Sequence, residues 1–449
     1  MDKHIATEDI GCFSEIFNSD PKNILALNAI TQTDITSVAL NREVVNRSDH
    51  TYSHLIETPK ATNQKGSGRC WMFAGLNAIR LIAMEKMNLK DFQFSQSHLM
   101  FWDKLEKANF FLENIIETCD EPLDGRLVQW LLDQPLSDGG QWDMFINLIE
   151  KYGVVPQSVM PETQSSSSSR RMNSMVVLKL RECASLLRNM HSKDATPEAM
   201  REAKGQMMQD IHKMLCIHLG QPPEKFTWSW RDKDNEFHRT EEITPVEFYA
   251  QHVGIDLNDY VCLINAPTQD KPYNKNYTVQ YLGNVVGGQI VRYLNVDINT
   301  LKQATTNMIK DGEPVWFGCD VGKDFQRDHG ILDPEVYNYP LLYGTTLNLN
   351  KAERLDYGHS RMTHAMVLTG VDIDNNDAPT KWRVENSWGT EHGDKGYEMM
   401  TDAWFDAYLY EVTVHKKYLS DELLAVLDTE PTVLPPWDPM GALATSENE

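Results

Sequence analysis

The chain has little of what marks cysteine-rich or membrane-spanning proteins. It holds seven cysteines among 449 residues, an odd number at wide spacings with no CxxC pair. This excludes a disulfide framework and a cysteine-rich zinc site, and it favours free thiols in a reducing, cytoplasmic compartment. No run approaches the roughly 18 apolar residues that span a bilayer, and the first residues lack a secretory pattern, so neither feature is expected.

Positive charge is also scarce. Only 42 basic residues stand against 65 acidic ones, which gives a formal net charge of -23. A surface this acidic repels phosphate backbones, so nucleic-acid binding is not expected. HExxH, EF-hand, Walker and dinucleotide glycine motifs are all missing, and we therefore predict no metal and no cofactor.

The order of predicted elements is helices first and strands last. Apolar residues cover nearly all faces of 70–88, as in a buried helix, and further helices are predicted at 95–119, 172–191 and 197–219. After about residue 310, short runs rich in β-branched and aromatic residues alternate with turns. This order indicates an α+β protein.

Two segments stand outside this pattern. The run "SSSSSRR" at 165–171 is polar and of low complexity, and it predicts an exposed loop. The last twenty residues hold four prolines, which exclude a regular helix or a central strand. They predict an extended arm.

The stretch "QKGSGRCW" at 64–71 puts a cysteine at the start of a helix. Cys70 is then either a buried structural thiol or a nucleophile that the helix N-terminus helps to ionise. A nucleophile also needs a base and a group that orients the base. His364 directly precedes an apolar strand, and Asn386 in "VENSWG" follows, with Trp388 able to shield the pair from water.

These motifs resemble those of papain-type cysteine peptidases. Gln64 and Cys70 match the first half of that signature, and His364 and Asn386 match the second. The glycines of "DGGQW" at 138–142 resemble those that line the substrate-binding wall of that fold, where a missing Cβ lets a substrate backbone approach.

The sequence differs from ordinary papain-type enzymes and resembles the bleomycin hydrolase / aminopeptidase C family. Ser67 stands where a disulfide cysteine is usual, and nearly three hundred residues separate Cys70 from His364, about twice the ~130–150 of the papain group. The motifs "QKGSGRCW", "DGGQWDM", "KWRVENSWG" and "LPPWDPMGALA" look like that family from residue 63 to 444, most of all like its animal members.

The resemblance implies a papain-like fold with a helical lobe, an antiparallel β lobe, a large helical insertion and a C-terminal arm. The expected division is an N-terminal extension at 1–60, the helical lobe with the nucleophile at 61–160, a mostly helical insertion at 161–300, the β lobe with His and Asn at 301–430, and the arm in the cleft at 431–449.

The resemblance also implies a role for each site residue. Cys70 and His364 form a thiolate–imidazolium pair, Asn386 orients the imidazole, and Gln64 with the Cys70 N–H stabilises the oxyanion. The residues implied to bind substrate are Gly139, Gly140, Trp71, Trp388 and Ala444.

The implied activity is that of a cytosolic thiol aminopeptidase acting on peptides and on amides beside a free amine, as in bleomycin. In the family the terminal carboxylate of the arm binds the free ammonium. Here "TSENE" extends past Ala444, so we predict either that Cys70 trims the tail or that the tail is tolerated. The resemblance further implies a homohexamer.

Two alternatives remain open from the sequence. One is a papain-fold acyltransferase that passes the same thioester to an amine, which product analysis with added amines would reveal. The other is a non-catalytic nucleic-acid-binding or scaffold protein. Alkylation of Cys70 by iodoacetamide would separate this last possibility from an enzyme.

Overall fold

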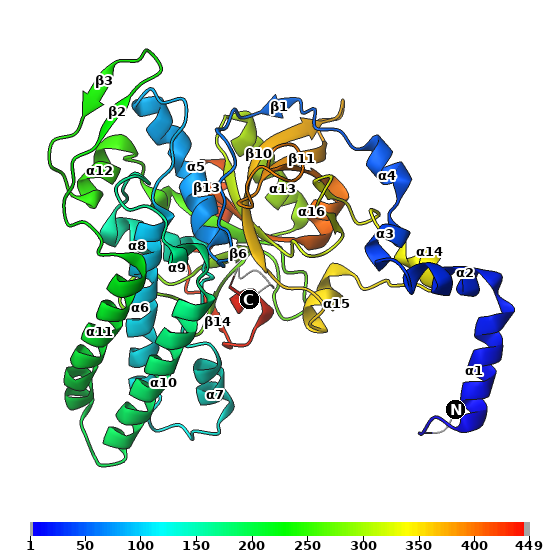
Figure 1. Ribbon diagram of the computed structural model, residues 1–449, viewed down its shortest axis with the longest axis horizontal. Coiled ribbons are helices and arrows are strands. Elements are labelled where there is room, and N and C mark those ends of the chain that lie inside the picture. Colours follow the sequence, from blue (N-terminus) through cyan, green and yellow to red (C-terminus); the bar gives the residue numbers. More distant parts are fainter. Residues whose placement is uncertain (1–2, 444–449) are drawn as a thin grey trace.

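Two lobes and a protruding N-terminal arm make up the protein (Figure 1). The structure is a computed structural model and describes residues 3–443. Helices fill one lobe and a twelve-stranded sheet the other, with the C-terminal segment between them. Within residues 3–443, every helix is too short or too polar to cross a membrane.

The helical lobe contains the predicted buried helix. α5 (Cys70–Lys86) is buried along most of its length, as apolar residues on all faces predict. α6 (Gln96–Glu117) begins after Ser95, whose side chain accepts a hydrogen bond from the backbone of His98. The other elements of this lobe are α7 (Arg126–Asp133), α8 (Trp142–Tyr152), α9 (Gln164–Ser167), α10 (Arg170–His191), α11 (Pro197–Leu219), β2 (Ser229–Arg231), β3 (Phe237–Arg239) and α12 (Pro245–His252).

The sheet is built around β10 (His364–Ile373). It runs antiparallel to β7 (Val315–Cys319) on one side and to β11 (Pro379–Glu385) on the other. The remaining strands are β1 (His54–Leu55), β4 (Tyr260–Ile264), β5 (Lys275–Val279), β6 (Tyr293–Asn295), β8 (Phe325–Gln326), β9 (Ile331–Leu332), β12 (Tyr397–Thr401), β13 (Leu409–His415) and β14 (Thr432–Leu434). The helices beside it are η1 (Leu257–Asp259), α13 (Ile298–Lys310), α14 (Tyr339–Tyr343), α15 (Lys351–Asp356), α16 (Asp402–Tyr408) and η2 (Lys416–Tyr418).

The lobes differ in two ways from the predicted division. β4, β5 and β6 belong to the central sheet, although 161–300 was expected to be a mostly helical insertion. β4 pairs with β13, and that pairing between distant segments has no local signal in the sequence. The sheet is also mixed rather than purely antiparallel, because β4 and β6, β5 and β14, and β9 and β12 pair in parallel.

The serine-rich run is not an exposed loop. Ser166 and Ser169 are fully buried, and α9 covers part of the run. The backbone N–H of Gly66 donates to the carbonyl of Ser167 at 3.0 Å, and that of Ser169 donates to the carbonyl of Gly66 at 3.2 Å. The prediction was wrong because these serines pair with the glycine turn that precedes Cys70, a distant segment that composition alone does not indicate.

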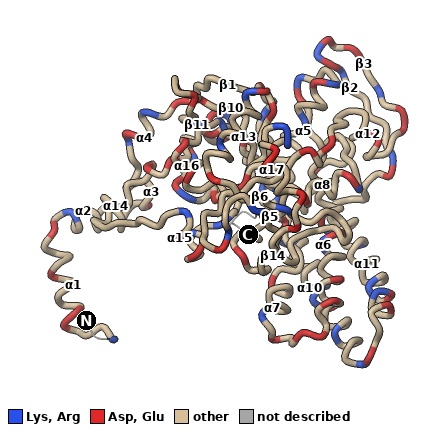
Figure 2. The backbone as a smooth tube through the Cα atoms, turned by 180° about the vertical axis from the view of Figure 1, so that it is seen from behind, with Lys and Arg blue, Asp and Glu red and all other residues tan. Residues whose placement is uncertain are grey.

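The N-terminal arm consists of four short helices. α1 stands clear of both lobes in Figures 1 and 2, and it has no buried residue. The helices of the arm are α1 (Thr7–Ser19), α2 (Pro21–Ile30), α3 (Ile35–Ala39) and α4 (Arg42–Arg47).

The C-terminal arm is extended, as its prolines predict. After α17 (Asp421–Leu427), β14 joins the sheet beside β5, and η3 (Pro439–Gly441) follows. The side-chain amide of Gln141 donates to the carbonyl of Ala442 at 2.9 Å. The predicted anchor Ala444 and the "TSENE" tail lie outside the described residues.

Candidate active site

The predicted nucleophile lies where the two lobes meet. Cys70 is the first residue of α5 and is fully buried. The backbone N–H of Ala365 donates to its sulfur at 3.4 Å, so the start of α5 contacts the start of β10. The unpaired N–H groups and dipole at a helix N-terminus favour negative charge on the sulfur.

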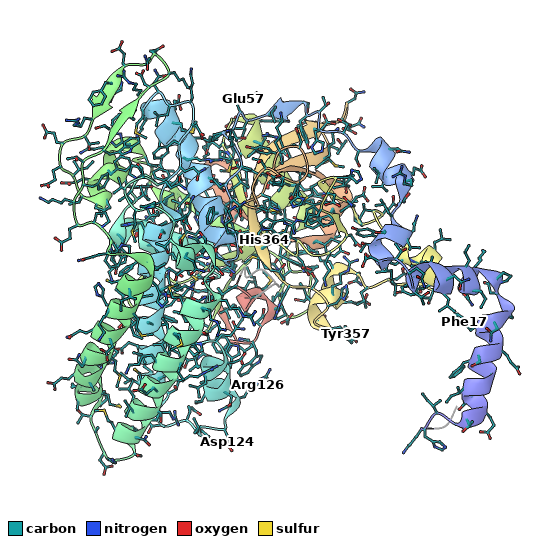
Figure 3. The ribbon with its side chains drawn as sticks, viewed as in Figure 1. Phe17, Glu57, Asp124, Arg126, Tyr357 and His364 are labelled. Carbon is teal, nitrogen blue, oxygen red and sulfur yellow. The ribbon has the colours of Figure 1, made fainter. Side chains whose placement is uncertain are left out.

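His364 is the first residue of β10 and lies between the lobes (Figure 3). Its Nε2 is 2.9 Å from the side-chain oxygen of Asn386, and because an amide oxygen only accepts, Nε2 carries the hydrogen. Nδ1 is buried and has no partner among the described residues. Burial lowers the pKa of His364 to about 4, against the opposing effect of the Asn386 hydrogen bond.

Asn386 is held from two further sides. The backbone N–H of Ser387 donates to its side-chain oxygen at 2.7 Å. Its side-chain NH₂ donates to Oε1 of Glu398 at 2.8 Å. These contacts fix the amide with its oxygen toward His364 and its nitrogen toward Glu398.

Trp388 packs against the imidazole of His364. Its ring centroid lies 4.9 Å from that of His364, at an interplanar angle of 40°. The guanidinium of Arg327 lies 4.8 Å from the centroid of the Trp388 ring. The aromatic ring therefore packs directly beside the imidazole.

Gln64 forms hydrogen bonds both to the turn before Cys70 and to the segment that follows Asn386. Its side-chain nitrogen donates to the carbonyl of Ser67 at 2.6 Å, and its side-chain oxygen accepts from the hydroxyl of Ser387 at 2.5 Å. Its backbone N–H also donates to the carbonyl of Ser387 at 2.8 Å. A primary amide has two N–H groups, so a second one remains for an acceptor in the cleft.

The predicted glycine wall contacts Trp71. A Cβ on Gly140 would lie 2.5 Å from the Trp71 ring, so only glycine fits there. The indole N–H donates to the carbonyl of Asp138 at 2.7 Å, and the carbonyl of Gly139 accepts from Lys107 at 2.5 Å. The structure brings these residues together beside Cys70, and no described contact tests their predicted role in binding substrate.

A buried carboxylate near Cys70, that of Asp138, has no local signal in the sequence. Asp138 accepts the backbone N–H of Gly68 at 3.0 Å, two residues before Cys70. Burial raises its pKa, but the ammonium of Lys104 and the hydrogen bonds from Lys104, Ser169 and Asn173 together outweigh burial and hold the pKa of Asp138 well below its usual range. The other donors to this carboxylate are Lys104, Ser169 and Asn173.

Gln141 and Glu398 were missed as well. Gln141 directly follows the paired glycines, and that position was the available signal for its contact with the arm. Glu398 is a charged residue in the otherwise apolar strand β12, a pattern that marks a buried polar group. Within residues 3–443, no group of three acidic, histidine or cysteine side chains is arranged to hold a metal ion.

Comparison with known proteins places this site in a family. The sequence profile of the Peptidase C1-like family matches residues 4–441. The chain belongs to this family. Curated relatives include bleomycin hydrolase of Homo sapiens, 48% identical with 98% of each chain covered. Aminopeptidase C of Listeria innocua is 48% identical, with 99% of this chain and 100% of the relative covered.

A solved structure of the same family has nearly the same backbone. PepW from Lactobacillus rhamnosis aligns with a TM-score of 0.97 at 48% identity, covering 99% of this chain and 100% of that one. This likeness and the family match confirm the predicted resemblance, the α+β papain-like fold and the predicted class of enzyme, a cysteine peptidase.

Proposed function

We propose that this Peptidase C1-like protein is a thiol aminopeptidase with Cys70, His364 and Asn386 as its catalytic residues. Two of its relatives are named aminopeptidase C and bleomycin hydrolase. The observation that carries the proposal is the 3.4 Å contact between the Cys70 sulfur and the N–H of Ala365. It sets the sulfur beside His364, whose other face is held by Asn386.

In the first step, the thiol of Cys70 gives its proton to Nδ1 of His364. Because burial lowers the pKa of His364 to about 4, the charged imidazole needs a nearby anion, and the thiolate is that anion. Asn386 orients the ring without adding a charge that would compete with the thiolate. The thiolate then attacks the carbonyl carbon of the substrate amide.

The negative oxygen that forms is stabilised by hydrogen-bond donors. The second N–H of the Gln64 side chain and the backbone N–H of Cys70 supply them, and one such donor is worth about 2.7–4 kcal/mol. His364 protonates the leaving amine, which departs and leaves a thioester on Cys70. A water molecule then hydrolyses the thioester with His364 as the base.

The C-terminal arm explains why the enzyme would act at the ends of peptides. The arm is tied down by Lys271, which pairs with Asp438 at 2.9 Å, and by Arg126, whose guanidinium lies 3.7 Å from the Trp437 ring centroid. Gln141, next to the glycine wall, binds the carbonyl of Ala442. We infer that the arm blocks the cleft beyond the first substrate residue and that its end, near Ala444, binds the free ammonium.

Hydrolysis of paired substrates tests this function. An aminoacyl fluorogenic amide with a free amine should be cleaved, and the same amide with an acetylated amine should not. Equal cleavage of both would contradict the aminopeptidase assignment. Intact-mass spectrometry of the wild type and of Cys70→Ala then shows whether the tail is trimmed. A wild-type mass that lacks tail residues present in Cys70→Ala supports trimming, and full-length masses for both proteins, with full wild-type activity, contradict it.

We further propose the homohexamer, with the N-terminal arm as a contact between copies. The exposed face of the arm is apolar, and exposed apolar faces of this kind mark interfaces. The apolar residues exposed there are Ile10, Phe13, Ile16, Phe17, Leu25 and Leu27. Light scattering should give a hexameric mass for the wild type and a smaller one for Phe13→Glu/Phe17→Glu. A monomeric wild type would contradict the assembly.

A cytoplasmic location and the absence of nucleic-acid binding complete the proposal. No disulfide joins any of the seven cysteines, all of which lie within the described residues, and four of the six besides Cys70 are buried, which suits a reducing compartment. The net charge of -23 disfavours nucleic acid. Electrophoretic mobility at low salt tests the second point, and a retarded nucleic-acid band would contradict it.

A further inference from the structure

Glu398 is a carboxylate buried beside the proposed catalytic residues with no role in the chemistry described so far. It lies on β12, opposite Val384 of β11, and is 3% exposed. Its Oε1 accepts the side-chain N–H of Asn386 at 2.8 Å. Its Oε2 is buried and has no partner among the described residues.

Burying a carboxylate with so few partners lowers the stability of the folded state. A buried carboxylate is normally paired with a cation or fully hydrogen-bonded, because burial without partners strongly disfavours its charge. Glu385, one strand away, follows that rule through its ion pair with Arg80. Glu398 instead accepts one hydrogen bond, from Asn386, and this contact with a proposed catalytic residue points to a role at the site.

We propose that Glu398 is a positioning residue, which fixes the orientation of the Asn386 amide and favours the charged form of the His364 imidazole. This inference rests on the proposed Cys70–His364–Asn386 mechanism. Glu398 does not touch the substrate or the reacting atoms, and it acts only through Asn386.

The orientation follows from donor and acceptor chemistry. An ionised carboxylate only accepts, so the side of the amide that faces Glu398 must be the NH₂ group. The amide oxygen is thereby turned toward His364, where it accepts the Nε2 hydrogen. If the amide turned over, its NH₂ group would face the N–H of His364, and both hydrogen bonds would be lost.

The charge of Glu398 acts along the same chain of hydrogen bonds. A negative charge on Glu398 polarises the amide and stabilises a positive imidazole. Burial raises the pKa of Glu398 to about 7, while the Asn386 hydrogen bond and the charge of Arg327 act in the opposite direction. Glu398 therefore ionises near neutral pH, and a proton arriving on His364 favours that ionisation.

The other titratable groups near Glu398 do not take over its effect on the charge of the His364 imidazole. Cys319 on β7 keeps its proton, because burial, Asp320, Glu398 and Cys70 raise its pKa well above the usual value. Arg327 is positive and disfavours a charged imidazole. Asp320 accepts hydrogen bonds from Ser360 and Thr363, whereas Glu398 is joined to the imidazole through Asn386.

The test is the pH profile of kcat/KM for Glu398→Gln and Glu398→Asp on the aminoacyl amide. Glutamine keeps the size and one oxygen but removes the charge, so kcat/KM should fall about tenfold. The alkaline limb should move to lower pH by about one pH unit, because the imidazolium loses a stabilising charge. Aspartate keeps the charge and should restore the position of the limb.

A double-mutant cycle with Asn386→Ala shows whether the effect passes through the amide. If it does, Glu398→Gln should change kcat/KM less than twofold in the Asn386→Ala background. Glu106→Gln is the matched control: this carboxylate is 5% exposed and pairs with Lys151 in the helical lobe, and its loss should leave the limb in place.

The rate of Cys70 alkylation by iodoacetamide gives a readout that needs no turnover. In Glu398→Gln, the alkaline step in the pH dependence of this rate should move to lower pH, as the alkaline limb of kcat/KM does. An unmoved limb and alkylation step in Glu398→Gln, or an equal loss with and without Asn386, would overturn the positioning role. If the wild type cleaves neither amide, the aminopeptidase proposal fails, and the alkylation profile still decides the role of Glu398.

Discussion

Asp138 and Glu398 are two buried carboxylates of the candidate site. Asp138 supports the turn before Cys70, and Glu398 supports the amide that holds His364. The ammonium of Lys104 and several hydrogen bonds keep Asp138 ionised, with its pKa well below the usual range. Glu398 has one hydrogen bond, and burial raises its pKa to about 7.

The difference shows how one residue class can serve two purposes. A carboxylate with a lysine partner and several donors is a fixed structural element across the working pH range. A carboxylate with a single donor changes its charge near neutral pH and can influence a neighbouring base. In the proposed mechanism, the Cys70 side thus provides rigidity and the His364 side controls a proton.

The largest effect is expected from removing the nucleophile. Cys70→Ala should abolish hydrolysis of the aminoacyl amide and leave the circular dichroism spectrum and Tm close to those of the wild type, because the thiol is small and the helix remains. Cys216→Ala, at a half-buried cysteine of α11, is the control and should stay active. Residual turnover in Cys70→Ala would mean that another group attacks the substrate.

Loss of the Asp138 charge should be the next largest effect. Asp138→Asn leaves Lys104 buried without its anion and should lower the free energy of unfolding by about 3–5 kcal/mol in urea titrations at pH 7. Because folding lowers the pKa of Asp138, the wild type should be more stable than Asp138→Asn above pH ~4. This difference in the free energy of unfolding should shrink as the pH falls below that value. Asp133→Asn, at an exposed residue, should be neutral. A stable Asp138→Asn protein would refute the structural role.

Gln64 contacts residues on both sides of the site, and its loss should lower kcat. Gln64→Ala should lower kcat by about 10²–10³, the loss typical of one oxyanion donor. Gln157→Ala, a partly buried glutamine that contacts Gln93, should keep its rate. Wild-type kcat in Gln64→Ala would remove this residue from the oxyanion site.

The smallest effect is expected at Glu411 of β13, a second buried carboxylate of the sheet that has no cationic partner among the described residues. Burial raises the pKa of Glu411 to about 8, so the native state holds this proton more tightly than the unfolded chain. Stability should therefore fall as pH rises from about 4.3 toward 8. Glu411→Gln should match the wild type near pH 4 and become increasingly more stable than it as the pH rises toward 8. A difference in Tm that does not change with pH would contradict this.

Much of the site could be predicted because its residues carry local signals. Cys70 stands at a helix start, His364 at a strand start, and Gln64 at a fixed offset from the cysteine. The structure brings these segments together, with Ala365 contacting the sulfur and Asn386 bonded to His364. The long helices also followed from apolar periodicity and from caps such as Ser95.

The rest depends on contacts between distant segments, which one sequence does not reveal. The side chain of Glu398 meets Asn386 only because β12 pairs with β11 in one register, Val384 opposite Glu398. The serine-rich run is buried only because its backbone meets Gly66. The membership of β4, β5 and β6 in the central sheet depends on partners far along the chain.

The C-terminal arm has a consequence that follows from its being covalently attached. A segment tethered by Arg126 and Lys271 keeps a constant effective concentration at the cleft, however dilute the protein becomes. A separate inhibitory peptide would dissociate on dilution and could be outcompeted by long substrates. A restriction to chain ends that is imposed by the arm would therefore hold equally at low and high enzyme levels, and only a change in the covalent chain would remove it.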